Sequence, residues 1–217
     1  MTRTLDGAVV AVVGTGGLGR ALATALAAHG ATVVVAGRSG AVDVRVDLTD
    51  ADAGATLVEH VTRTHGRLDG VVIAAGVVAF GELADTEDVV VEELLLTNAM
   101  GPLWLAKRVM PALRDSKGFL VNISGMVAAT PMPGMAAYSA SKAAAAAGFA
   151  ALRKELRRAG VLVCDVQPPH TETGLATRPL AGPAPRLPQG LEPEVVAERI
   201  VAAIEADQPL VSSTDFG

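Results

Sequence analysis

Short apolar runs rich in valine alternate along this chain with longer segments whose alanines and leucines recur at helical spacing. This alternation is typical of parallel strands joined by crossover helices, because strands buried on both faces are apolar throughout. The apolar runs predict strands at residues 8–13, 32–36, 43–47, 70–74, 118–123, 161–166 and 209–213. The periodic segments predict helices at 18–29, 51–65, 87–97, 99–115, 138–159 and 193–206. We therefore expect a three-layer α/β/α protein with a doubly wound, mostly parallel, seven-stranded sheet.

The 217 residues suit a single domain spanning 1–217, since the sequence contains no internal repeat or interdomain linker. Residues 168–193 are rich in proline and glycine and follow neither the helical nor the strand period, which predicts a loop. In a doubly wound sheet this loop leaves the carboxyl end of a strand, where ligands bind. We expect it to be a substrate lid; the alternative is a surface connection stiffened by prolines.

Charge and cysteine content exclude several classes of protein. The formal net charge of −5 and the absence of a basic run argue against a nucleic-acid partner. The single cysteine, Cys164, cannot form an internal disulfide, and its apolar surroundings in the sequence predict a buried structural thiol. The longest apolar stretch, 143–152, is about half the length of a membrane-spanning helix. We expect a cytoplasmic protein without a membrane association, and we predict no metal site.

A glycine-rich turn directly follows the first predicted strand and opens the first predicted helix. It consists of Gly14, Thr15, Gly16, Gly17, Leu18 and Gly19. Glycines permit the tight turn and allow backbone amides to approach a pyrophosphate, while the helix N-terminus contributes partial positive charge. The position between strand and helix therefore favours dinucleotide binding over an ordinary strand-to-helix turn.

Arg38 and Ser39 follow the second predicted strand, at a position where NAD-binding proteins carry an acidic residue. An acid there holds the two ribose hydroxyls of NAD, whereas an arginine can pair with the 2′-phosphate of NADP. The sequence therefore favours NADP over NAD, and the competing interpretation is that Arg38 is a solvated surface residue.

The order and spacing of several motifs resemble the short-chain dehydrogenase/reductase family over essentially the whole chain. The most specific match is Tyr138-Ser-Ala-Ser-Lys142, supported by Asn98. The resemblance implies a Rossmann fold and further cofactor-binding positions at Asp47, Leu48, Ala74, Ala75, Gly76, Pro168, Thr171 and Thr173. It also implies that Lys142 holds the nicotinamide ribose, that Asn98 helps to hold a water for proton relay, and that the chain forms a homodimer or homotetramer.

Tyr138 and Lys142 lie four residues apart, so they share one face of the predicted helix. A tyrosine hydroxyl ionises near pH 10, and a neighbouring ammonium together with a positive nicotinamide ring is expected to lower its pKa. Tyr138 could then exchange a proton with a carbonyl oxygen during hydride transfer. We therefore expect an NADP(H)-dependent ketoreductase or alcohol dehydrogenase that acts on a small ketone or secondary alcohol.

One departure from the family pattern concerns the catalytic serine, which usually lies thirteen residues before the tyrosine. That position is Gly125, and the nearest serine is Ser124, whose side chain is expected to point the other way if the strand continues. Ser124, Thr130, His170 or the substrate itself could replace the missing hydroxyl. The alternatives to a reductase are therefore a catalytically weak NADP(H)-binding sensor or partner protein, and a non-redox dehydratase, cyclase or epimerase.

The glycine-rich loop and the connection between the second and third strands also differ from the family pattern. The loop is one residue shorter than usual, and only eight residues separate Arg38 from Asp47, too few for the usual crossover helix. Ile73-Ala74 stands where paired asparagines are common, and Pro169 replaces the usual turn glycine.

Overall fold

The computed structural model describes residues 3–217, and within them seven strands form one sheet. The strand order is β3-β2-β1-β4-β5-β6-β7, and every neighbouring pair is parallel. The strands are β1 (Val9–Val13), β2 (Thr32–Gly37), β3 (Val44–Arg45), β4 (Gly70–Ile73), β5 (Phe119–Ile123), β6 (Leu162–Val166) and β7 (Leu210–Val211). The order reverses between β1 and β4, so the crevice at their carboxyl ends is the expected ligand site of a doubly wound sheet.

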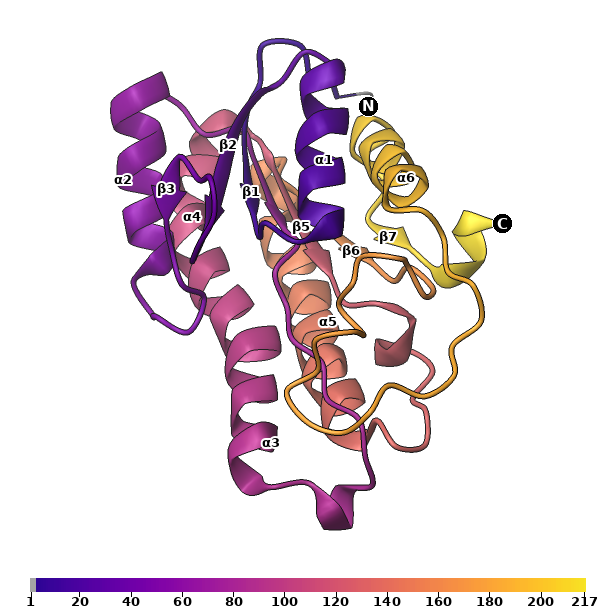
Figure 1. The fold of residues 1–217 in the computed structure, drawn as a ribbon. Coiled ribbons are helices and arrows are strands. Elements are labelled where there is room, and N and C mark those ends of the chain that lie inside the picture. Colours follow the sequence, from indigo (N-terminus) through magenta and orange to yellow (C-terminus); the bar gives the residue numbers. More distant parts are fainter. Residues whose placement is uncertain (1–2) are drawn as a thin grey trace.

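Helices cover both faces of the sheet (Figure 1). They are α1 (Gly17–Ala28), α2 (Ala53–His65), α3 (Asp88–Leu95), α4 (Gly101–Ser116), α5 (Ala136–Leu156) and α6 (Pro193–Glu205). Helices α1 and α6 pack side by side on one face, while α2, α4 and α5 cover the other. The predicted fold class, a three-layer Rossmann-type α/β/α fold, is confirmed.

The first strand shows why the apolar runs become buried strands. All five of its residues are buried, and their side chains alternate between the two faces. Val9, Ala11 and Val13 join the core beneath α2, α4 and α5, whereas Val10 and Val12 join the core beneath α1 and α6. Because a strand inside such a sheet has no solvent-facing side, its sequence is apolar without alternation.

Several predicted boundaries were wrong. Strands β3 and β7, at the two edges of the sheet, are each only two residues long, because few ladder bonds form at these edges. The two helices predicted at 87–97 and 99–115 form one continuous run joined by a π-helical turn, η2 (Leu96–Met100). The helix predicted to begin at Tyr138 begins at Ala136 instead and ends at Leu156 in the short 3₁₀ turn η4 (Arg157–Ala159).

The connection between β2 and β3 contains no helix, as its length required. Residues 38–43 form a bend, and the Asp43 carboxylate accepts a hydrogen bond of 2.8 Å from the backbone amide of Val35. The Asp43 amide in turn donates to the Val35 carbonyl over 2.9 Å. This pair of bonds turns the chain back onto the sheet edge without a crossover helix.

The run from Asp88 to Ser116 is apolar enough, with a mean hydropathy of 1.3 over 18 residues, and long enough to span a membrane by those two criteria alone. Its buried residues, among them Leu94, Leu105 and Val109, pack against the sheet and against α2 and α5. An amphipathic core helix of a folded domain has the same composition.

The segment between β6 and α6 contains no helix or longer strand among the described residues, as predicted. Its two ends are joined by a bridge between Thr171 and Leu191, and its middle is fastened to the chain after β4. The Leu180 amide donates to the Val78 carbonyl over 2.8 Å, and the Phe80 amide donates to the Ala181 carbonyl over 2.9 Å. We refer to residues 171–191 as the cover loop.

Candidate active site

The turn after β1 presents a row of unpaired backbone amides. Within residues 3–217, the amides of residues 15–19 have no hydrogen-bond partner, and they surround the N-terminus of the twelve-residue helix α1. Gly14 has φ of +123°, and a Cβ added there would lie 2.6 Å from the backbone nitrogen of Ala75. A Cβ on Gly19 would overlap the carbonyl oxygen of Gly14. The residues therefore fit the pyrophosphate of a dinucleotide, which needs free amides and no intervening side chains.

The end of β2 and the residues that follow it contact the glycine-rich turn at Thr15. The Thr15 hydroxyl lies 3.5 Å from the Ser39 carbonyl, and Thr15 Cγ2 would be 3.1 Å from a Cβ on Gly37. The Arg38 side chain is 59% exposed, and its Nη1 is 3.9 Å from Asp47 Oδ2. Arg38 is therefore held only loosely and remains accessible at the end of the crevice.

Asp47 and Leu48, which the family resemblance assigns to the adenine side, have structural partners. The Asp47 carboxylate accepts bonds from the backbone amide and hydroxyl of Thr49, at 3.0 and 2.8 Å. Leu48 is buried, and its carbonyl packs so closely against Gly101 that no side chain would fit there. These contacts fix the chain after β3 beside the first turn of α4.

Gly76, Asn98 and Lys142 meet where β4 ends. A Cβ added to Gly76 would lie 3.1 Å from Asn98 Oδ1 and 3.3 Å from Lys142 Nζ. Ala74 continues the ladder by donating its amide to the Val13 carbonyl over 2.8 Å. The three segments that carry these motifs, widely separated in sequence, thus converge beside the glycine-rich turn.

The Asn98 side chain fastens the chain after β4 to α5. Its Nδ2 donates to the Val77 carbonyl over 2.9 Å and to the Ser141 hydroxyl over 3.1 Å, while its Oδ1 accepts from the Val77 amide over 3.0 Å. The Ser141 hydroxyl in turn donates a hydrogen bond to the Tyr138 carbonyl over 2.7 Å. Since both amide N–H groups of Asn98 are used, its side chain positions the loop and α5.

Tyr138 and Lys142 project from the first turns of α5, and both are buried. Burial raises the pKa of Tyr138 to about 12, because the phenolate would lose its hydration. Burial lowers the pKa of Lys142 to about 8, and the neighbouring Asp165 carboxylate partly opposes this shift. The Lys142 ammonium donates to the Ile123 carbonyl over 2.8 Å. The predicted lowering of the Tyr138 pKa depends on a bound nicotinamide ring as well as on Lys142 and stays a prediction; in the protein chain alone, desolvation is the dominant effect.

Ser124 is turned away from this cluster, and its predicted catalytic role conflicts with its contacts. It is fully buried, and its hydroxyl donates to Asp165 Oδ2 over 2.8 Å. The same carboxylate accepts from Asn122 Nδ2 at 2.8 Å and Gln167 Nε2 at 3.1 Å. Ser124 therefore belongs to a buried polar network between β5 and β6. An aspartate inside the apolar run of β6 was the sequence feature that could have revealed this network.

The residues expected to face the nicotinamide lie at the base of the cover loop. The Pro168 carbonyl accepts from the Met126 amide over 3.0 Å, and the Thr171 hydroxyl donates to the Pro169 carbonyl over 2.9 Å. Thr173 rests on the glycine-rich turn, since its Cα would lie 2.9 Å from a Cβ on Gly17. Of these residues, Thr173 is therefore the one in direct contact with the glycine-rich turn.

His170 and Thr130, considered as substitutes for the missing serine, lie elsewhere. His170 Nε2 is 3.5 Å from Glu172 Oε1 at the base of the cover loop, and Thr130 is exposed.

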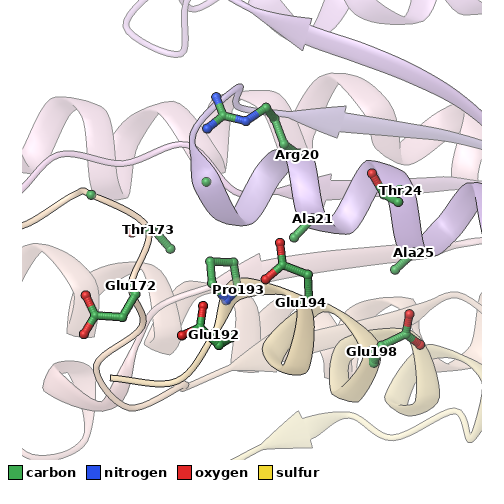
Figure 2. Close-up of a pocket in the computed structure, with 12 residues that line it drawn as sticks. Arg20, Ala21, Thr24, Ala25, Glu172, Thr173, Glu192, Pro193, Glu194 and Glu198 are labelled. Carbon is green, nitrogen blue, oxygen red and sulfur yellow. The ribbon is translucent and has the colours of Figure 1, made fainter. Parts of the chain in front are cut away.

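A cavity of about 520 Å³ opens between α1 and the segment that leads into α6 (Figure 2). It touches the glycine-rich turn at Gly17, and its opposite wall carries four carboxylates. These belong to Glu172, Glu192, Glu194 and Glu198. Because these carboxylates outnumber Arg20, the one basic residue lining the cavity, the cavity suits a pyrophosphate less well than the unpaired amides of the turn.

The fold, the glycine-rich turn and the Tyr138–Lys142 pair define a nicotinamide-dependent oxidoreductase, and comparison with known proteins identifies the family. Residues 8–181 match the family model described as short chain dehydrogenase. The chain belongs to this family of NAD(P)-dependent dehydrogenases and reductases.

Individual relatives agree with this assignment. An uncharacterized oxidoreductase of Staphylococcus aureus is 31% identical over 212 residues, which cover 90% of each chain. A short-chain dehydrogenase of Burkholderia cenocepacia in complex with NADP superimposes with a TM-score of 0.85 at 25% identity, over 97% of this chain and 90% of that one. A 3-ketoacyl-(acyl-carrier-protein) reductase of Brucella melitensis, complexed with NADH, has the same fold, with a TM-score of 0.85 at 20% identity over 98% and 100% of the two chains.

Proposed function

We propose that the protein is an NADP(H)-dependent ketoreductase acting on a small ketone or secondary alcohol, with Tyr138 as the acid that protonates the carbonyl oxygen. The observation that carries the proposal is the convergence of Gly76, Asn98 and Lys142 beside the unpaired amides of the glycine-rich turn, with Tyr138 one helical turn before Lys142 on α5. The reduced dinucleotide would supply the hydride. With a pKa near 12, Tyr138 holds its proton at neutral pH, which suits it to the reduction direction.

Lys142 would maintain the protonation of Tyr138 and hold the cofactor ribose. Its pKa of about 8 leaves it mostly protonated at neutral pH and able to release a proton as Tyr138 gives up its own. Asn98 would act as a positioning residue, because it holds both the loop after β4 and the carbonyl of Tyr138 through Ser141.

The activity is tested by following NADPH consumption with a panel of small ketones and aldehydes. Tyr138→Phe removes the acid but keeps the ring, and we expect at least a hundredfold lower kcat with unchanged NADPH affinity. Arg63→Gln, an exposed substitution on α2, is the control and should leave both kcat and the affinity for NADPH unchanged. Equal turnover by the wild type and Tyr138→Phe would refute the role of Tyr138.

The preference for NADP over NAD rests on Arg38, whose accessible guanidinium stands where a carboxylate would favour NAD. We expect Arg38→Gln to weaken NADPH binding about tenfold or more while leaving NADH binding nearly unchanged. Calorimetric titration with both nucleotides measures this difference. An equal loss for NADPH and NADH would remove the basis for an NADP preference.

A second candidate function is a nucleotide-binding protein without redox turnover, and Gly125 is the observation that favours it. No hydroxyl group stands at the usual serine position, and the neighbouring Ser124 is bound to Asp165. This alternative predicts tight NADPH binding without consumption of any carbonyl. Retention of all label on a deuterated cofactor, with chemical change of a substrate, would instead indicate a non-redox reaction.

We also propose a homodimer or homotetramer, supported by the partly exposed, alanine-rich face of α5 and by α4 beside it. Light scattering at micromolar concentration tests this proposal. A monomeric mass throughout the range would contradict it.

A further inference from the structure

Gly125 lies between two segments that touch the Tyr138–Lys142 pair. Two residues before it, the Ile123 carbonyl accepts the Lys142 ammonium; two residues after it, Val127 packs in the same apolar cluster as Tyr138. Gly125 has φ of +80°, and the atom nearest to a Cβ built on it is Val127 Cγ2, at 4.0 Å. There is consequently open space at residue 125, between these two segments, for a small polar group, and residue 125 itself supplies none.

Except for Ser139, the nearby hydroxyl and amide donors are committed to other partners. Ser124 donates to Asp165, Ser141 donates to the Tyr138 carbonyl, and both N–H groups of Asn98 have acceptors. The Ser139 hydroxyl is buried without a partner in the described residues. Successive residues of a helix are separated by about 100°, so Ser139 and Tyr138 project from different faces of α5.

In the proposed reaction the Tyr138 hydroxyl donates to a carbonyl oxygen that gains negative charge, and residue 125 adds no second hydroxyl. The apolar cluster that includes Tyr138 also contains Val78, Phe80, Leu94, Val127 and Met135. A buried oxygen that gains charge is stabilised further by a second donor. A substrate that carries its own donor next to the carbonyl would supply this second donor.

From this geometry we infer that the substrate class is a neutral hydroxyketone, whose own hydroxyl, one or two carbons from the carbonyl, occupies the space beside Gly125 and takes the place of the missing serine. The inference rests on the proposed ketoreductase function. In the reaction, the carbonyl carbon gains the hydride from NADPH and the carbonyl oxygen gains the proton of Tyr138. The products are a diol and NADP⁺, and Tyr138 recovers its proton from solvent by way of Lys142.

The test compares three small ketones as substrates with NADPH: hydroxyacetone, methoxyacetone and butanone. Methoxyacetone keeps the electron-withdrawing oxygen but has no donor, and butanone replaces the hydroxyl by a methyl group. We expect kcat/KM for hydroxyacetone to exceed that for methoxyacetone about tenfold or more, since 1.4 kcal/mol corresponds to a factor of ten. Equal values for the three ketones would overturn the inference and leave the ketoreductase function intact.

Substitution at residue 125 provides the complementary test. Gly125→Ser restores a hydroxyl and should narrow the preference for hydroxyacetone by raising turnover of the other two ketones. Gly125→Ala introduces the same backbone strain without a hydroxyl and should leave the preference unchanged. Ser139→Ala should also leave it unchanged; loss of ketone turnover in Ser139→Ala would assign the second donor to Ser139 and overturn the inference.

A binding measurement separates this inference from the proposed function. Calorimetry on the wild-type protein saturated with NADP⁺ should show tighter binding of hydroxyacetone than of methoxyacetone without any turnover. If the folded protein binds NADPH but consumes none of the three ketones, the ketoreductase proposal fails. If it consumes them but binds and reduces both oxygenated ketones equally, only the hydroxyketone inference fails.

Discussion

The buried ammonium of Lys142 should impose a measurable pH dependence on stability. Burial lowers its pKa from 10.5 to about 8, so between these values the unfolded chain binds a proton that the folded chain does not. Stability therefore rises with pH through this window, because it increases wherever the unfolded state binds more protons. Below about pH 8 both states are protonated, and the full cost of burying the charge is present.

The size of the effect follows from the two pKa values. A difference of 2.5 units corresponds to about 3 kcal/mol at low pH, at about 1.4 kcal/mol per unit. At pH 7 nearly all of this cost remains, whereas at pH 9.5 about 1.4 kcal/mol is left, since most folded molecules are then neutral at Lys142. The wild type should thus gain about 2 kcal/mol relative to Lys142→Met between pH 7 and pH 9.5.

Urea denaturation of the wild type and Lys142→Met at the two pH values measures this relative gain. Comparing the two proteins cancels the titration of every other group that behaves alike in both. Lys154→Met, an exposed position on the same helix, is the control and should show a difference in stability that barely changes with pH. If the difference in free energy of unfolding between the wild type and Lys142→Met also did not change with pH, the ammonium would not be desolvated in the folded protein.

Three further predictions follow from backbone geometry and from one ion-pair cluster. Gly182→Ala should loosen the cover loop and speed its cleavage by trypsin, because the new Cβ would overlap the backbone of the chain after β4. Gly134→Ala is the control, since Gly134 has a similar positive φ but open space around it. It should lower the free energy of unfolding by only about 1 kcal/mol. Gly19→Ala should lower the Tm markedly, whereas Gly16→Ala, with no neighbour within 4 Å, should leave it within a few degrees. The pKa of His29 is raised by two glutamates of α6, so the stability it contributes is complete below pH 6.5 and is lost as pH rises through its folded pKa. His29→Gln should therefore lose more stability at pH 6 than at pH 8.5 in urea titrations, and the reverse order would contradict the raised pKa.

Local patterns in the sequence were sufficient for the layers of the fold and for part of the site. The apolar strand β1, the glycines from Gly14 to Gly19 and the four-residue spacing of Tyr138 and Lys142 depend on neighbours close in the chain. A run of valines predicts a buried strand, and spacing of four predicts a shared helical face, without knowledge of any distant contact. Gly14 can likewise adopt its positive φ because glycine has no Cβ, which is a property of the residue itself.

Only the tertiary structure decided what each polar group of the site can do. Asp165 lies 41 residues from Ser124 in the sequence, yet its carboxylate accepts the Ser124 hydroxyl and places that serine outside the reaction. Burial by segments distant in sequence raises the pKa of Tyr138, whereas Lys142 and a bound nicotinamide ring are expected to lower it. Hydrogen-bond partners and desolvation depend on which distant segments meet, so residue types and spacing predict which groups gather at the site, while packing determines their protonation and their free donors.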